Sequence, residues 1–287
     1  MKLKNYDLEQ IIKKPVVISQ KSTLLDARSV LLRHKIGRLI VLKDEKPIGI
    51  ITEKDLARAI YTLKAKPADK TSVSEAMSKR LVTVDENVTL YACAKLMLTN
   101  KISSVLVLKK NGSLSGIITK TDIASVFLTQ AVEPLGISKI MTKKVITVKP
   151  ADSLLYVENV LTKNKLSRVV VERNRRPVGI ITYRDFIPAK IPMWIRQFGD
   201  PIEVEKYRMT NRPSEYQSNQ LSYLATFIAA DIMTSNPVTV EVSDDVSTAS
   251  LLMIRYGISG LPVVKDSLLV GIITKTDIVK AIATEIN

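Results

Sequence analysis

Aliphatic runs typical of buried β-strands recur along the chain, and each is followed by the same heptapeptide. The pattern Gly-Ile-Ile-Thr-x-x-Asp occupies residues 49–55, 116–122, 179–185 and 271–277. Apolar residues at three- and four-residue spacing precede each run and are clearest over residues 246–256, which predicts an amphipathic helix there. A further short strand lies upstream of each helix, so each copy predicts a β-α-β-β-α unit of about 60 residues.

The four predicted units alternate in type. The first and third carry Arg38 and Arg168 at the start of the central strand, where the second and fourth carry Ser104 and Gly260. This alternation indicates duplication of a two-unit module, and a unit of this size buries little surface alone. We therefore expect an α/β protein in which four tandem units form two pairs. The first pair spans residues 1–130, with units at about 8–66 and 71–130, and the second spans 131–287, with units at about 137–190 and 229–287.

An insertion of residues 191–228 separates the third unit from the fourth. It concentrates aromatic side chains in a chain that is only 5% aromatic. We expect it to supply additional core, a lid, a dimer contact or a docking element for a partner. Its aromatic residues are Trp194, Phe198, Tyr207, Tyr216, Tyr223 and Phe227.

The composition excludes several common kinds of catalytic and metal site. The 287 residues include one cysteine, Cys93, and one histidine, His34. One thiol allows neither an intramolecular disulfide nor a Cys-rich metal site. One imidazole does not allow a multi-histidine metal site within one chain. The chain also lacks the Gly-x-x-x-x-Gly-Lys-[Ser/Thr] phosphate loop. We therefore expect a non-enzymatic protein that requires no cofactor or metal.

The distribution of apolar residues predicts a cytoplasmic protein. The N-terminal residues contain no apolar core that suits a signal peptide. No stretch approaches the roughly 18 apolar residues that cross a bilayer. The low cysteine content fits a reducing compartment, and we expect no membrane partner.

The Thr-x-x-Asp part of the heptapeptide has two interpretations. In the first it is a capping box, in which the threonine and the aspartate bond to each other's backbone N–H at the start of a helix. In the second the carboxylate accepts hydrogen bonds from ribose hydroxyls, while the helix N-terminus and nearby cations bind phosphate. Four copies keep both the threonine and the aspartate while the two residues between them vary.

The repeated unit resembles the cystathionine β-synthase (CBS) domain. The resemblance rests on Ile-Met-Thr at residues 232–234, Val-Thr-Val at 238–240, Gly-Ile-Ser-Gly-Leu-Pro-Val-Val at 257–264 and the heptapeptide. Four copies resemble two Bateman modules, an arrangement also seen in the regulatory γ subunit of AMP-activated kinase. The resemblance implies clefts between paired units that bind AMP, ADP or ATP, with S-adenosylmethionine as an alternative, and an effector on another, unknown protein.

The resemblance also assigns roles to residues of this chain. The ribose-contacting aspartates correspond to Asp55, Asp122, Asp185 and Asp277. Threonines on the phosphate side correspond to Thr52, Thr119, Thr182 and Thr274. The threonine of the first strand corresponds to Thr83, Thr147 and Thr239, with Val17 in the first unit. Arg38 and Arg168 match a position where related domains place a phosphate-binding cation. Independently of the resemblance, further cations for phosphate lie inside or beside the motif: Lys54, Lys120, Arg184 and Lys275. We expect the fourth unit to carry the best site and the first the weakest.

The net charge of +15 suggests a second hypothesis. The excess of lysine and arginine lies in the first and third units, and a basic surface is typical of proteins that bind nucleic acid. The alternative function is therefore a nucleic-acid-binding regulator that nucleotide modulates. Solvated surface lysines explain the charge equally simply, and a homodimer is compatible with either hypothesis.

Overall fold

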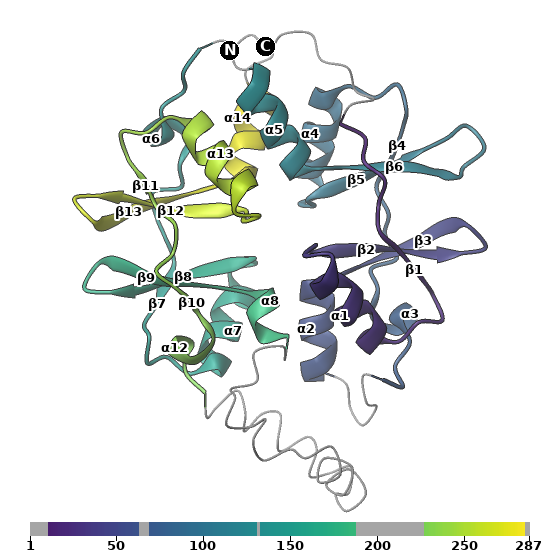
Figure 1. Cartoon of the computed structure of the whole chain (residues 1–287), viewed down its shortest axis with the longest axis horizontal. Helices are drawn as coiled ribbons and strands as arrows, with labels where there is room; N and C mark the ends of the chain where they lie inside the picture. Colours follow the sequence, from purple (N-terminus) through teal and green to yellow (C-terminus); the bar gives the residue numbers. More distant parts are fainter. Residues whose placement is uncertain (1–10, 63–68, 131–132, 188–226, 285–287) are drawn as a thin grey trace, which may run out of the picture.

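Four α/β units surround the centre of the computed structural model (Figure 1), which describes residues 11–62, 69–130, 133–187 and 227–284. The insertion at 191–228 lies outside these ranges except for its last two residues. Unit 1 contains β1 (Val17–Ser19), α1 (Leu24–Arg33), β2 (Arg38–Lys43), β3 (Lys46–Thr52) and α2 (Glu53–Thr62). Unit 2 contains α3 (Val73–Ala76), β4 (Thr83–Asp85), α4 (Leu90–Thr99), β5 (Ser104–Leu108), β6 (Leu114–Thr119) and α5 (Lys120–Gln130).

Units 3 and 4 repeat this order of elements. Unit 3 contains α6 (Ile137–Ile140), β7 (Thr147–Val148), α7 (Leu154–Lys163), β8 (Arg168–Arg173), β9 (Arg176–Thr182) and α8 (Tyr183–Phe186). Unit 4 contains α12 (Ala229–Ile232), β10 (Thr234–Ser235), β11 (Val240–Glu241), α13 (Val246–Arg255), β12 (Gly260–Lys265), β13 (Leu268–Thr274) and α14 (Lys275–Thr284). The predicted β-α-β-β-α unit is confirmed four times.

Each unit has a small sheet in which a parallel pair of strands is extended by an antiparallel hairpin. In unit 1 the order is β1-β2-β3, and units 2 and 4 follow the same scheme. In unit 3 the order is β10-β9-β8-β7, because β10 of unit 4 adds a fourth strand. The hairpin turns of units 1, 3 and 4 place two consecutive residues at positive φ, such as Asp44 and Glu45 in unit 1 and Asn174 and Arg175 in unit 3. Turns of this kind match the twist of the flanking strands, which fixes the register of each hairpin.

The units pair by exchanging the segment that precedes each sheet. Thr234, at the start of unit 4, pairs antiparallel with Ile180 of unit 3, and Thr142 of unit 3 pairs with Ile272 of unit 4. Units 1 and 2 exchange segments in the same way through isolated bridges. These bridges are Ile50 to Ser78 and Lys13 to Ile117. The structure therefore joins unit 1 to unit 2 and unit 3 to unit 4, as the alternation of types predicts.

Close packing within each pair explains the glycine of the heptapeptide. A Cβ added at Gly49 would lie 2.4 Å from Met77 Sδ, and one added at Gly179 would lie 2.4 Å from Met233 Sδ. Both methionines arrive from the paired unit on the exchanged segment. The heptapeptide glycine therefore packs against the methionine of a second repeated motif, Ala-Met-Ser at residues 76–78 and Ile-Met-Thr at 232–234.

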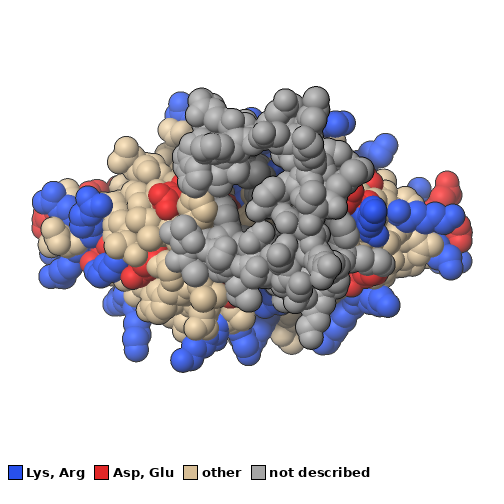
Figure 2. Space-filling model, turned by 90° about the horizontal axis from the view of Figure 1, so that it is seen from below, with Lys and Arg blue, Asp and Glu red and all other residues tan. Residues whose placement is uncertain are grey.

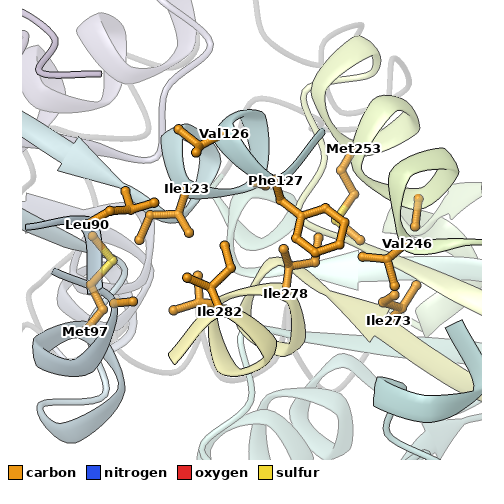
Figure 3. Packing of buried hydrophobic residues seen from close by; sticks show 14 of the residues in the cluster. Leu90, Met97, Ile123, Val126, Phe127, Val246, Met253, Ile273, Ile278 and Ile282 are labelled. Carbon is orange, nitrogen blue, oxygen red and sulfur yellow. The ribbon is translucent and has the colours of Figure 1, made fainter. Parts of the chain in front are cut away.

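The two pairs join through helices rather than sheets. Helices α4 and α5 of unit 2 pack against α13 and α14 of unit 4 in the most extensive buried cluster of the described residues. Figure 3 shows Phe127 between Met253 and Ile278 in this cluster, and Phe127 is fully buried. Below it, Ala57 of α2 packs in the cluster that contains Tyr183 and Phe186 of α8. The sequence predicts the pairs but not these helical contacts between them.

Cys93 belongs to the buried cluster that joins units 2 and 4. Burial raises the pKa of its thiol to about 11, so the thiol stays protonated and unreactive at neutral pH. Over the described ranges, none of the helices is both long and apolar enough to cross a membrane.

Candidate functional site

The four Thr-x-x-Asp motifs form the same local structure. In each, Oδ2 of the aspartate accepts the backbone N–H and the hydroxyl of the threonine. For Thr274 and Asp277 these distances are 2.9 and 2.7 Å, and for Thr119 and Asp122 they are 2.8 and 2.6 Å. The other two pairs are Thr52 with Asp55 and Thr182 with Asp185. The aspartate half of the capping box is therefore present in all four motifs, and the reciprocal bond from the aspartate N–H to the threonine hydroxyl joins Asp55 to Thr52 and Asp122 to Thr119. The cap engages only one of the two carboxylate oxygens.

In the even-numbered units, 2 and 4, the second carboxylate oxygen of the motif aspartate faces the paired unit. Asp277 is 4% exposed, and its Oδ1 lies 3.5 Å from Oγ1 of Thr142 in unit 3. Lys280 Nζ lies 3.7 Å from the same oxygen. Asp122 is 6% exposed, and its Oδ1 lies 3.7 Å from Nζ of Lys13 in unit 1. Both carboxylates thus lie at a junction between paired units.

An arginine from each odd unit approaches these junctions. Arg168 crosses from unit 3 to unit 4, where its Nη2 donates to Ser259 Oγ at 2.6 Å. Its Nη1 lies only 2.2 Å from the position of a Cβ built on Gly260, so the guanidinium fits because residue 260 has no side chain. Arg38 occupies the equivalent place in the first pair, and its Nη1 is buried with no hydrogen-bond partner in the described structure. A buried donor of this kind is an opening for an acceptor from a ligand.

Two lysines connect the even units across the centre. Lys120 Nζ donates to Thr276 Oγ1 of unit 4 at 2.9 Å, and Lys275 Nζ donates to Thr121 Oγ1 of unit 2 at 3.0 Å. Each lysine and each threonine lies in the first turn of its helix, inside the heptapeptide. The two bonds are a reciprocal exchange between the pairs.

These cations are close enough to perturb one another. Burial lowers the pKa of Lys120 to about 8, and the charges of Arg38 and Arg168 act in the same direction. Burial, followed by the charges of Arg168 and Arg38, likewise lowers the pKa of Lys275 to about 8. Burial also lowers the pKa of Arg168, to about 10, against the opposing effect of Asp277. The centre therefore holds partly desolvated positive charge that a bound anion would stabilise.

Charged groups of the two odd units pair with each other instead. Arg184 Nε donates to Glu53 Oε1 and forms an ion pair between units 3 and 1. Burial raises the pKa of Glu53, and Arg184 opposes that shift. Lys54 Nζ lies 5.4 Å from the centre of the Tyr183 ring, within reach of a cation–π interaction. Arg184, one of the predicted phosphate-binding cations, is thus engaged by a carboxylate.

The structure brings some predicted site residues together and not others. Arg38, Lys120, Arg168, Lys275 and the aspartates of units 2 and 4 lie around the centre. Among the described residues, no hydrogen bond joins Thr83, Thr147 or Thr239 to a motif aspartate; these roles stay predictions. Thr147 donates to Glu172 at 3.3 Å and lines a separate hollow of about 270 Å³ beside α7.

Several residues at the centre were not predicted. They are Lys13, Glu53, Thr121, Thr142, Ser259 and Thr276. The sequence does carry a signal for Thr121 and Thr276. Units 2 and 4 both read Lys-Thr-Asp at the end of the heptapeptide, whereas unit 1 reads Glu-Lys-Asp and unit 3 reads Tyr-Arg-Asp. Thr142 belongs to Ile-Met-Thr, a motif that marked the unit without suggesting contact with Asp277.

Comparison with known proteins agrees with this architecture. The CBS domain family model matches residues 7–62, 73–129, 137–191 and 229–284. Protein MJ1225 of Methanocaldococcus jannaschii is 26% identical over 289 residues, which cover 94% of this chain and 96% of MJ1225. The crystal structure of MJ1225, proposed as an archaeal homologue of γ-AMPK, aligns with a TM-score of 0.79 and 23% identity over 96% of this chain and 99% of that one.

Two further structures show how far the likeness extends. A conserved protein from Pyrococcus horikoshii aligns with a TM-score of 0.59 and 21% identity, over 94% of this chain and 96% of that one. The CBS domain pair of protein MJ0100, crystallised with 5′-methylthioadenosine and S-adenosyl-L-methionine, is 27% identical with a TM-score of 0.37, and covers 42% of this chain and 94% of that one. Because the family model matches most of the sequence, the chain belongs to the CBS domain family, with four CBS units in two Bateman modules.

Proposed function

We propose that this protein is a non-enzymatic regulator that binds adenosine nucleotides in the clefts between its paired CBS units. The observation that carries the proposal is the convergence of Arg38, Arg168, Lys120 and Lys275 on one centre. Four units supply one cation each, and none of the four side chains is fully solvated. Such an arrangement suits a group with several negative charges, such as the phosphates of AMP, ADP or ATP.

The cleft of unit 4 offers the best contacts for a nucleotide. Asp277 Oδ1 can accept a ribose hydroxyl, because its long contacts to Thr142 and Lys280 are readily replaced. Arg168 already lies across the junction, and Lys275 lies two residues before the aspartate. Each charge-assisted hydrogen bond contributes about 1.5–3 kcal/mol, so two or three of them, less the cost of association, support micromolar to millimolar affinity.

The other clefts differ from this one in specific ways. In the cleft of unit 2, the ammonium group of Lys13 lies beside the carboxylate of Asp122, where Thr142 lies in the second pair. In the clefts of units 1 and 3, the ion pair of Arg184 with Glu53 removes one expected cation from phosphate binding. We therefore rank unit 4 first and unit 2 second, and we place Asp55 and Asp185 after them.

A ligand at the centre would contact both Bateman modules, here taken as residues 1–130 and 131–287. Lys120 and Lys275 each bond to a threonine of the other module. A phosphate that draws either lysine away from its threonine changes the contact between the modules. Bound ligand then favours one relative orientation of the modules, by the difference between its binding free energies for the two orientations. An effector protein would read that orientation.

The test is a calorimetric titration of ligand-stripped protein with AMP, ADP, ATP and S-adenosylmethionine at about 200 mM salt, where weak attraction between charges is screened. Saturable binding of a nucleotide with a fixed stoichiometry supports the proposal. Binding of S-adenosylmethionine alone replaces the nucleotide with that ligand. If none of the four binds, the Thr-x-x-Asp motifs are helix caps only and the proposal is wrong.

A further inference from the structure

The end of the β8–β9 hairpin is unusually basic. Arg173, Arg175 and Arg176 fall within four consecutive residues, separated only by Asn174, and all four are exposed. Arg173 and Arg176 are direct cross-strand partners. Like charges directly opposite each other destabilise a hairpin. The sequence therefore carries an electrostatic cost at this position.

The acidic residue that precedes these arginines in the sequence is bonded to other groups. The carboxylate of Glu172 accepts hydrogen bonds from Lys149 Nζ at 3.0 Å, from Thr147 Oγ1 at 3.3 Å and from the backbone N–H of Arg175 at 2.9 Å. Within the part of the chain that the structure describes, the three guanidinium groups make no ion pair. They remain available to a partner.

The fold does not require this net charge, because unit 1 builds the same hairpin end with two cross-strand lysines that Asp44 and Glu45 balance. Residues 43–46 there read Lys-Asp-Glu-Lys and carry no net charge. The backbone is equivalent: φ is 48° and 63° at Asp44 and Glu45, and 52° and 62° at Asn174 and Arg175. The register also matches, since Lys43 is the cross-strand partner of Lys46. The arginines are thus a property of unit 3 and not of the CBS hairpin.

The basic hairpin end is also held in place. The carbonyl of Arg175 accepts the backbone N–H of Leu269, in the neighbouring hairpin of unit 4, at 2.7 Å. Its own N–H is bonded to Glu172, so both sides of this residue are fixed. Figure 1 shows the hairpin projecting at the edge of the molecule, and Figure 2 shows basic side chains gathered at that end. Because the backbone is already fixed, binding at this hairpin end costs little backbone conformational entropy.

We propose that the β8–β9 hairpin end, residues 173–176, is a contact site for the phosphate backbone of duplex DNA. A two-stranded β-ribbon fits the major groove of B-form DNA. Guanidinium groups form paired hydrogen bonds with phosphate and are less strongly hydrated than lysine ammonium groups. Three arginines therefore favour direct contacts with phosphate groups over a long-range attraction between charges. The chain is only 5% aromatic, so the contact reads backbone rather than stacked bases.

The experiment exchanges the hairpin end for the one that unit 1 already uses. The variant carries Arg173→Lys, Asn174→Asp, Arg175→Glu and Arg176→Lys, which removes three units of positive charge while keeping a turn sequence that folds in this chain. A control variant, with Lys43→Gln, Lys46→Gln and Lys109→Gln, removes the same charge from the hairpins of units 1 and 2. Circular dichroism and thermal melting confirm that both variants are folded.

Binding of a fluorescent mixed-sequence duplex of about two helical turns is followed by anisotropy between about 50 and 200 mM salt. The exchange is expected to weaken binding at least about tenfold at 100 mM salt. It should reduce the slope of log K against log salt by about 1 to 3, since each phosphate contact contributes about 0.9 and the two remaining lysines are balanced by the new acidic residues. The control is expected to keep most of the affinity and slope.

Three results would overturn the proposal. The first is no binding of the duplex by the unaltered protein at the lowest salt. The second is an equal loss in the exchanged and control variants, which would make the effect one of net charge. The third is competition by polyglutamate, at matched charge concentration, as strong as that by unlabelled duplex, which would indicate an acidic protein partner. None of these depends on nucleotide binding, so this proposal and the proposed function fail separately.

Discussion

Binding of a polyphosphate at the centre should draw protons from solution. Lys120 and Lys275 have a pKa of about 8 against an ordinary 10.5, mainly because burial disfavours their charged form. A phosphate beside them returns each pKa toward its ordinary value. At pH 8 each free lysine is about half protonated, so binding should take up about half a proton per lysine and about one in total.

The sign and size of the pH dependence follow from this uptake. Because the complex holds more protons than the free protein, affinity should fall as the pH rises through 8. Between pH 7 and pH 9 the protonated fraction of each free lysine falls about tenfold. The loss of affinity over that range is therefore at most about tenfold for each lysine. The terminal phosphate of a nucleotide has a pKa near 6 and is already deprotonated, so it adds little to the uptake.

The assay is calorimetric titration with ATP at pH 8 in two buffers that differ in enthalpy of ionisation. The observed enthalpy should differ between them by about one proton's worth of buffer ionisation. A variant with Lys120→Arg and Lys275→Arg keeps both charges but does not titrate near pH 8, so the buffer dependence should vanish. Saturable binding with the same enthalpy in both buffers would refute the reasoning, because it would show that the two lysines do not meet the phosphates.

Three further predictions address the cleft and the core. Asp277→Asn should weaken nucleotide binding about tenfold, because the amide cannot accept from both Thr274 and a ribose hydroxyl. Asp26→Asn alters an equivalent but solvent-exposed cap on α1 and should leave the titrations unchanged; an equal loss in both variants would contradict the ribose assignment. Gly260→Ala should displace the Arg168 guanidinium and weaken ATP several-fold in the same titration while the melting temperature holds; unaltered affinity would show that this guanidinium does not contact phosphate. Phe127→Ala should destabilise the protein by about 3–5 kcal/mol in denaturant titrations, since the ring is fully buried, and a loss below about 1 kcal/mol would contradict tight packing between the modules.

The fold followed from the sequence where the signal was local or repeated. Aliphatic runs, turn residues and four copies of one heptapeptide were enough to predict the unit and its pairing. The contact of Gly49 with Met77 shows what remained hidden. Both residues stand out as repeated in the sequence, but nothing in the spacing says that the methionine of one unit covers the glycine of its partner.

The candidate site was harder to predict because its groups come from different units. The aspartates and cations could be selected one unit at a time, since each lies in a repeated motif. Whether a cation stays available depends on what another unit places beside it. Arg184 forms an ion pair with Glu53, whereas the guanidinium of Arg168 lies over Gly260, which has no side chain. Such outcomes depend on contacts between residues about 90 or more positions apart, which no local pattern records.

The alternation of unit types has a physical meaning at the centre of the molecule. Odd units contribute Arg38 and Arg168, and even units contribute a lysine and a threonine that pair across the two modules. Two like units could not build the same centre, because the arginine needs a small residue opposite it, as Gly260 is for Arg168. The result is a set of cations brought together from four units before any ligand arrives. Their mutual repulsion and desolvation oppose folding, and the attraction of a bound anion offsets these costs. Nucleotide should therefore stabilise the contact between modules as well as fill a cleft, by an amount that grows with ligand concentration above the dissociation constant.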